Sequence, residues 1–175
     1  LTHTAKAVKI STTNVGSNIA TRWNTLNKVM LTNKIDIACY QETRVHNKEE
    51  MTLQSSVPTH KLYGCHATRE QSIALWQIKK AKKLRKKYTI NNDKLETIPM
   101  DSSKAWNDLG LITLIRKDWA NKVMDIIRDK ERRFLTTPIR INDSLILIII
   151  NVYAPVKKDE NEIFFDRFSK HIDHL

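Results

Sequence analysis

Apolar and polar positions in the first part of the chain follow the order strand, helix, strand. Residues 8–14 (VKISTTN) alternate between apolar and polar, which predicts a half-buried β-strand. Residues 35–40 (IDIACY) predict a second strand. Between them, apolar residues recur at the spacing of one helix face: Ile19, Trp23, Leu26 and Met30. This order predicts a β-α-β unit, in which the crossover is nearly always right-handed and the two strands are parallel.

Strand-like patterning continues further along the chain. Residues 61–67, 110–116, 123–127 and 134–141 are each predicted to form a strand, and residues 43–57 are polar with at most a short helix. The polar residues 142–144 (NDS) predict a hairpin turn after the last of these strands.

The last strand and the last helix have the strongest apolar patterns. Residues 145–153 (LILIIINVY) are apolar at nearly every position, as expected for an interior strand covered on both faces. Pro155 ends this strand because proline cannot donate to a sheet. Asp159 is expected to cap a helix, with Glu162 as its capping-box partner. The apolar face of that helix consists of Phe164, Phe168, Ile172 and Leu175.

The positive charge of the chain is concentrated in one segment. The 175 residues carry a net charge of +11, and subtracting the seven basic residues of the run 79–87 leaves +4. Such a run attracts phosphate without reading sequence; a solvated helix face or a nuclear-import signal is an equal alternative. The run lies in residues 70–105, interpreted as a basic insertion in one domain (8–175), because about 35 residues build no independent core.

The cysteine count and the absence of a leader favour an intracellular protein of the nucleus or the cytoplasm. No apolar run reaches the roughly 18 residues that span a bilayer, so no membrane partner is expected, and the first residues lack a signal-peptide pattern. The missing initiator Met suggests a processed, trimmed or partial chain. A zinc site is an alternative on residue types alone, although its spacing fits no known pattern: Cys39, Cys65, His46, His60 and His66.

Three short strings stand at the ends of predicted strands: T-N-V at 13–15, Q-E-T at 41–43 and N-V-Y-A-P at 151–155. The carboxyl ends of neighbouring parallel strands meet at one rim, so Asn14 and Glu42 should lie together. A carboxylate and an amide oxygen suit Mg²⁺, which keeps several waters for substrate phosphate to displace. Taken singly, each string also fits an ordinary turn or strand end.

In this order the strings resemble the endonuclease/exonuclease/phosphatase superfamily, and within it the apurinic-type endonucleases of LINE-type retrotransposons. GLITLIRKDW at 110–119 and Arg132-Arg133-Phe134 are similar to further strands of that group, and the likeness covers residues 8–67 and 110–175. The resemblance implies an α/β (α+β) DNase I-like fold, a two-sheet β-sandwich flanked by helices. It also implies a hydrolase that cuts phosphodiester bonds in DNA with Mg²⁺, or alternatively Mn²⁺.

The resemblance implies catalytic roles for three residues. Glu42 matches the metal-binding glutamate, and Asn14 matches the asparagine that supports metal and phosphate. Tyr153 matches the tyrosine that contacts the scissile phosphate. A water molecule would attack in line while the metal neutralises phosphoryl charge.

Further residues are implied in supporting and binding roles. Gln41 and Asn151 would hold the site from beneath, and Arg44 and Asn151 would take part in binding substrate phosphate or nucleic acid. The basic run would contribute to nucleic-acid binding through Lys79, Lys80, Lys82, Lys83, Arg85, Lys86 and Lys87.

The sequence also departs from the family. The strings G-D-x-N and S-D-H, which belong to the family's second half, do not occur, and Asp173-His174 is interpreted as a solvated helix end. The chain is therefore expected to be truncated before that half and inactive alone, its partner being the missing C-terminal half or a reverse transcriptase region. Half a sandwich would expose an apolar face with Leu147 and Ile149, which favours self-association.

Two other functions stay open at this point. A phosphoesterase of the same fold could act on a lipid or inositol phosphate instead of DNA. A non-catalytic module could bind nucleic acid through the basic run at 79–87.

Overall fold

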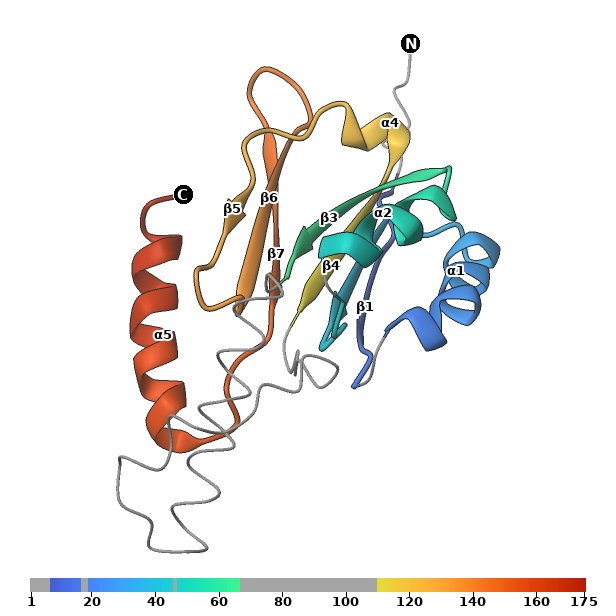
Figure 1. The fold of residues 1–175 in the computed structure, drawn as a ribbon. Helices are drawn as coiled ribbons and strands as arrows, with labels where there is room; N and C mark the ends of the chain where they lie inside the picture. The colour runs from blue at the N-terminus through green and yellow to red at the C-terminus, as the bar shows by residue number, and fades with distance from the viewer. Residues whose placement is uncertain (1–6, 17–18, 46, 67–109) are drawn as a thin grey trace, which may run out of the picture.

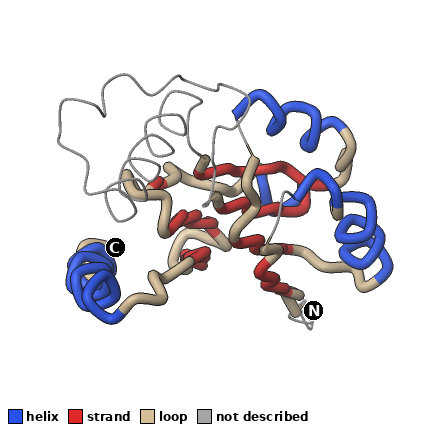
Figure 2. The backbone as a smooth tube through the Cα atoms, turned by 60° about the horizontal axis from the view of Figure 1, so that its bottom comes forward, coloured by secondary structure: helices blue, strands red, loops and turns tan. Residues whose placement is uncertain are grey.

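A computed structural model describes residues 7–16, 19–45, 47–66 and 110–175 of the chain. The predicted insertion at 70–105, with its basic run, lies outside the described residues, and so does His46. The described residues form two β-sheets packed face to face, with helices α1 and α2 on one side and α5 on the other (Figures 1 and 2). The predicted α+β sandwich flanked by helices is therefore confirmed.

The first sheet has four strands in the order β1-β2-β4-β3. Their bounds are Ile10–Asn14, Ile37–Gln41, His60–Cys65 and Leu111–Arg116 for β1 to β4. Strands β1 and β2 are parallel, as the predicted crossover requires, while β4 runs antiparallel to both of its neighbours. As a consequence β1, β2 and β3 all end at the same rim.

Two helices cover the outer face of this sheet. Helix α1 (Trp23–Thr32) follows a short 3-10 turn, η1 (Ile19–Thr21), so the regular helix begins later than predicted. The reason is a tertiary hydrogen bond: Ile19 N donates to Thr43 O at 2.8 Å, which ties this segment to the rim. Helix α2 (Asn47–Ser55) follows β2.

The second sheet has the order β5-β6-β7, and all of its neighbouring strands are antiparallel. Its strands are β5 (Ile127–Arg128), β6 (Phe134–Arg140) and β7 (Ile146–Val152). The predicted hairpin between β6 and β7 is confirmed. The strand predicted over 123–127 is wrong for most of its length: Val123 forms an isolated bridge to Ile139, Ile127 begins β5, and the residues between them are in no strand. Helix α4 (Lys117–Ala120) was not predicted.

Strand β7 is an edge strand and is not covered on both faces, contrary to the prediction. Ile149 points into the space between the sheets and is 7% exposed, and Leu147 packs against the same cluster. The residues in between, Ile146 and Ile148, face outward and are 43% and 37% exposed. Successive side chains of a strand alternate between its faces. The exposed apolar face of β7 therefore carries Ile146 and Ile148, whereas the sequence analysis had placed Leu147 and Ile149 on it.

Helix α5 (Lys158–Ile172) packs on the outer face of the second sheet. Phe164 is buried and stacks on Phe168, whose ring lies 5.5 Å from that of Phe134 on β6. The predicted cap is wrong: the helix begins one residue before Asp159, and no side chain caps it. Asp159 lies instead in the first turn, where a carboxylate favours the helix dipole.

Candidate functional site

Three predicted site residues meet at the rim where β1, β2 and β7 end. Asn14 Nδ2 donates a hydrogen bond of 2.9 Å to Glu42 Oε1. The hydroxyl of Tyr153 donates to the Glu42 carboxylate as well. Glu42 is thus the common partner of two side chains that lie 28 and 111 residues away in sequence.

The turn after β1 fixes the direction of the Asn14 side chain. Its Oδ1 accepts a hydrogen bond from Gly16 N at 3.0 Å, while Val15 N continues the sheet by donating to Gln41 O at 2.9 Å. Gly16 has a φ of +62°, in the left-handed region that glycine adopts without steric cost. The turn N-V-G therefore points the amide of Asn14 at Glu42.

The turn after β2 holds Glu42 in an unusual backbone conformation. Glu42 and Arg44 have φ values of +53° and +51°, uncommon for residues with a side chain. Thr43 between them is fully buried, and its N donates to Gly110 O at 3.1 Å while its O accepts from Ile19 N. Left-handed conformations of this kind gather at functional sites, where the surrounding contacts hold them in place.

A buried pair of amides joins the two sheets directly beneath the rim. Gln41 Nε2 donates to Asn151 Oδ1 at 2.6 Å. Asn151, which is 1% exposed, donates through Nδ2 to Tyr40 O at 3.2 Å and to Ile112 O at 3.0 Å. Asn151 thus connects β7 with β2 and β4, and it does not reach the solvent at the rim. Both amides lie beneath the rim, as expected of supporting residues, but the predicted phosphate-binding role of Asn151 does not fit, because its side chain is buried and its amide bonds to protein atoms.

The electrostatics of the cluster keep Glu42 ionised. The hydrogen bond from Tyr153 lowers the pKa of Glu42 most, followed by the bond from Asn14 and the charge of Arg44, with burial acting in the opposite direction. Burial and the hydrogen bond to Glu42 raise the pKa of Tyr153, so its hydroxyl stays a neutral donor. Arg44 Nη2 lies 3.9 Å from Glu42 Oε2, and its side chain is 44% exposed, which leaves it accessible to a substrate.

The donor atoms at the rim fit a hydrated hard cation. The rim offers one ionised carboxylate and the Asn14 Oδ1, which accepts from Gly16 N and keeps a second lone pair. Mg²⁺ commonly takes only one or two carboxylates and keeps several waters. The zinc alternative gains no support: the described residues hold no group of three or more His, Cys, Asp or Glu side chains placed to bind a metal. Cys39 and Cys65 are buried free thiols, and burial raises the pKa of each to about 11.

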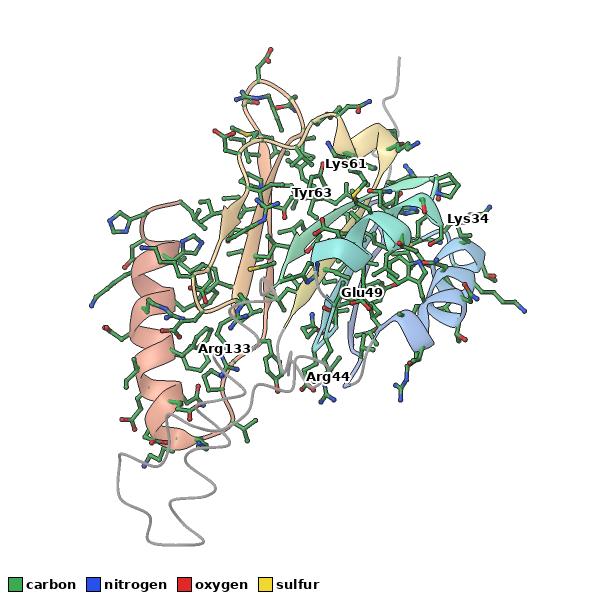
Figure 3. The ribbon with its side chains drawn as sticks, viewed as in Figure 1. Lys34, Arg44, Glu49, Lys61, Tyr63 and Arg133 are labelled. Atoms are coloured by element: carbon green, nitrogen blue, oxygen red, sulfur yellow. The ribbon has the colours of Figure 1, made fainter. Side chains whose placement is uncertain are left out.

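Arg133 also lies next to the cluster, a position that sequence reasoning missed. Its guanidinium stands 5.5 Å from the centre of the Tyr153 ring, and its carbonyl accepts a 2.7 Å hydrogen bond from Tyr153 N. Figure 3 shows Arg133 and Arg44 at the same end of the two sheets. The arginine pair at 132–133 was visible in the sequence, but only the hairpin geometry brings it beside residue 153.

A cavity of about 510 Å³ opens beside the end of β3. His66 Nε2 lies 3.6 Å from Glu50 Oε2 in its wall, and burial raises the pKa of Glu50. Arg128 of β5 lines the cavity as well and donates to Gly64 O at 2.8 Å. The sequence analysis treated His66 only as a possible zinc ligand. The pairing of His66 with Glu50 could not be predicted, because it depends on how α2 packs on β3.

The other predicted candidates do not join the cluster. Lys79, Lys80, Lys82, Lys83, Arg85, Lys86 and Lys87 lie outside the described residues. Asp173 and His174 form the exposed end of α5, and that end is remote from the rim, since α5 starts near the rim and runs away from it (Figure 1). Their interpretation as a solvated helix end agrees with this position. No helix in the described part is long and apolar enough to cross a membrane.

The arrangement of sheets and helices is the DNase I-like fold, a two-sheet α+β sandwich. No protein-family description and no curated protein matches the sequence. Among solved structures, the AP endonuclease LMAP from Leishmania major superposes with a TM-score of 0.52 at 14% identity, covering 85% of this chain and 40% of that one. An AP endonuclease from Archaeoglobus fulgidus gives 0.50 at 16% identity, with 85% and 42% covered.

A third structure, truncated TDP2 from Caenorhabditis elegans, superposes with a TM-score of 0.51 at 12% identity and covers 96% of this chain and 57% of that one. At these identities the likeness establishes the fold. The chain spans well under two thirds of the length of each of these structures.

Proposed function

We propose that this chain is the N-terminal portion of a Mg²⁺-dependent phosphodiesterase, an endonuclease that acts on DNA. The observation that carries the proposal is the ionised Glu42 carboxylate, bound by Asn14 and Tyr153 at one rim of the sandwich. Two of the structures with this fold are AP endonucleases, which supports a DNA substrate. The motif order T-N-V, Q-E-T, N-V-Y-A-P supports a retrotransposon origin.

Each rim residue has a defined part in phosphodiester hydrolysis. Glu42 and Asn14 would hold Mg²⁺, with Mn²⁺ as an alternative, through their oxygens. The bound ion supplies charge neutralisation at the phosphoryl oxygens and the leaving group. Tyr153, a neutral donor, would hydrogen-bond a phosphoryl oxygen on which negative charge develops. Arg44 would add a positive charge from the exposed side of the rim.

The cluster contains no group suited to activate the attacking water. Glu42 is already bound by Asn14 and Tyr153, and the G-D-x-N and S-D-H strings do not occur in the sequence. Because a positioned general base contributes roughly 10² to 10⁴ in rate, we expect this chain alone to be a poor nuclease. Its partner would be a C-terminal half or a reverse transcriptase region, with residues 8–175 forming a partial domain and 70–105 a basic insertion.

The two rival functions predict different ligands. A phosphoesterase for lipid or inositol phosphates would bind those headgroups in competition with DNA. A non-catalytic module would bind DNA through residues 79–87 alone, and Mg²⁺ would not strengthen that binding. The net charge of +11 favours nucleic acid over a small phosphate ester.

The test measures the effect of Mg²⁺ on DNA binding by the 175-residue chain. The affinity for a labelled duplex with an abasic-site analogue is followed by fluorescence anisotropy in Mg²⁺ and in EDTA. We expect Mg²⁺ to strengthen binding at least several-fold, and Glu42→Gln to abolish that gain. Glu162→Gln, an exposed change of the same kind on α5, should retain it. A gain that survives in Glu42→Gln, or no gain in the unchanged chain, would refute the proposal.

A further inference from the structure

The cavity beside the end of β3 lies outside the cluster at the rim and has the size of a ligand site. Its volume of about 510 Å³ is within the range of roughly 300–1,000 Å³ that small-molecule sites occupy. Strands β3 and β5, which border it, are the outermost strands of their sheets, opposite the side where β1 and β7 are outermost. The polar groups that line it come from α2, from the end of β3 and from β5: Glu50, His66 and Arg128.

Gly64 leaves the space that the polar groups of the cavity need. A Cβ atom at this position would collide with His66 Nε2 and would lie 2.8 Å from Glu50 Oε2. Gly64 is not among the residues with a positive φ, so glycine is required here for space and not for backbone conformation. Glycine inside a strand weakens the strand and often marks a position that a ligand or another group approaches closely.

The carboxylate and the guanidinium in the cavity both keep hydrogen-bonding capacity. Glu50 Oε2 lies 3.6 Å from His66 Nε2, which is too long for a hydrogen bond. Burial raises the pKa of Glu50, and the charge of Arg128 opposes this effect. Arg128 uses its Nε for a 2.8 Å hydrogen bond to Gly64 O, which leaves the fork of its two Nη atoms. A ligand that donates to Glu50 and accepts from Arg128 would offset the cost of burying the carboxylate.

Apolar side chains complete the lining of the cavity and favour a flat ring. Met51 is 80% exposed, and Leu62 of β3 lies on the same cavity. A thioether makes favourable contacts with aromatic rings. A planar heterocycle would therefore cover Met51 with its face while its polar edge meets the carboxylate and the guanidinium.

The cavity lies directly behind the turn that carries Glu42 and Arg44. A Cβ atom at Gly110 would lie 3.4 Å from Arg44 N and 3.5 Å from His66 Nδ1, so both groups pack on the same glycine. His66 in turn lines the cavity. A ligand in the cavity and a phosphate at the rim would therefore occupy neighbouring sites.

We propose that this cavity binds an unpaired guanine base of the nucleic-acid substrate through Glu50 and Arg128. The edge of guanine presents, in order, the donors N2–H₂ and N1–H and the acceptors O6 and N7. A carboxylate accepts from both donors, and a guanidinium donates to both acceptors. The guanine has to be unpaired because a base pair occupies its N1–H and N2–H₂ groups.

The other bases match this pair of side chains less well. Adenine and cytosine each offer the carboxylate a single amino group, and the N–H of thymine or uracil is flanked by two carbonyls that repel it. The role of the guanine as part of the substrate rests on the proposed function. Recognition of the base itself needs neither Glu42 nor a metal ion.

The first experiment compares nucleotides that differ only in the base. Isothermal titration calorimetry measures the binding of the monophosphates of guanosine, adenosine, cytidine and inosine to the 175-residue chain in EDTA. We expect guanosine monophosphate to bind at least about tenfold more tightly than the adenosine and cytidine nucleotides. Inosine monophosphate, which lacks only the 2-amino group, should bind more weakly by several-fold. Equal affinity for the guanosine and adenosine nucleotides would overturn the proposal.

Variants assign the two halves of the base to the two side chains. Glu50→Gln should abolish the preference for guanosine over inosine monophosphate, because an amide oxygen and an amide NH₂ cannot both accept. Arg128→Gln should weaken both nucleotides about tenfold and retain that preference. Glu49→Gln, which removes the neighbouring carboxylate of α2 outside the cavity lining, is the matched control and should bind like the unchanged chain. A preference that survives in Glu50→Gln would refute the site. The comparison of nucleotides on the unchanged chain remains decisive even where a variant lowers Tm.

Oligonucleotides distinguish a base in a nucleic acid from a free nucleotide. In EDTA, a single-stranded thymine tract with one central guanine should bind several-fold more tightly than the same tract with hypoxanthine in its place. If only the free nucleotides are discriminated, the cavity takes guanine nucleotides and the role in substrate recognition is refuted. If the oligonucleotides are discriminated but Mg²⁺ does not strengthen duplex binding, the base site stands and the proposed metal site fails.

Discussion

At the scale of single residues, the site is defined by what each side chain already binds. Asn14 and Tyr153 both donate to Glu42, so one carboxylate organises the rim before any cation or substrate arrives. The motifs named these three residues, but they contained no sign that Glu42 would stand at a φ of +53°. That conformation depends on hydrogen bonds from Thr43 to Gly110 and from Ile19, which are remote in sequence.

The hydroxyl of Tyr153 should control the charge state of Glu42. The pKa of Glu42 is held below its usual value mainly by this hydrogen bond, so we expect Tyr153→Phe to raise it. A carboxyl group with a lowered pKa stabilises the fold above its unfolded pKa, and this contribution is lost as the pH falls through the folded pKa. Carboxyl-carbon NMR titration gives the pKa directly.

The unchanged chain should therefore be more stable to unfolding than Tyr153→Phe wherever Glu42 is ionised. This difference in stability should be largest near neutral pH and shrink on acidification through the acidic range where Glu42 takes up its proton. A Glu42 pKa that does not move in Tyr153→Phe would show that Asn14 and Arg44 hold it down without the tyrosine. Tyr88→Phe, outside the rim motifs, serves as the control for loss of a phenol.

At the scale of elements, most of the strands and the hairpin were predictable because period-two patterning and turn residues are local signals, and the segment 123–127 was the exception. The start of α1 was not predictable, because the backbone of Ile19 is held by a hydrogen bond to Thr43 O, which is remote in sequence. The cap of α5 was also misplaced. Asp159 fits the capping pattern, but the N-cap position, where the backbone is still extended, is occupied by Lys157. The edge position of β7 is a property of the whole sheet, and an apolar run such as 145–153 does not reveal it.

The link between the two sheets beneath the rim should contribute strongly to stability. Asn151→Ala would remove the shortest acceptor of Gln41 Nε2, which would keep Thr12 Oγ1 at 3.0 Å, and the buried donor to the carbonyls of Tyr40 and Ile112. Because unsatisfied buried polar groups are costly, we expect a loss of about 2–4 kcal/mol in the free energy of unfolding. Urea denaturation measures it.

The control for this change is Asn24→Ala on the exposed face of α1, which should stay within about 0.5 kcal/mol of the unchanged chain. A similar, small effect at both positions would mean that the amide pair does not hold the sheets together.

At the scale of the whole molecule, the sandwich has an open side where β1 and β7 are the outermost strands of their sheets. A cavity of about 360 Å³ lies between them, lined by residues of β1, β2 and β7. The sequence predicted an exposed apolar face but placed it on the wrong side of β7, because the register depends on which face meets the other sheet. Apolar side chains are exposed on β7 as expected, but they are Ile146 and Ile148 and not Leu147 and Ile149. Self-association is therefore still expected.

We therefore expect the isolated chain to self-associate through the exposed edge of β7. An unpaired strand edge with apolar side chains is a template for pairing with another chain, and a charged residue on it blocks that pairing. Ile148→Lys should shift the chain toward monomer in sedimentation velocity over a concentration series. Val156→Lys adds the same charge at an 89% exposed position outside the strand, and it should change the distribution much less. Equal effects of the two lysines would assign the association to net charge, and a monomeric unchanged chain would remove the edge of β7 as an association surface.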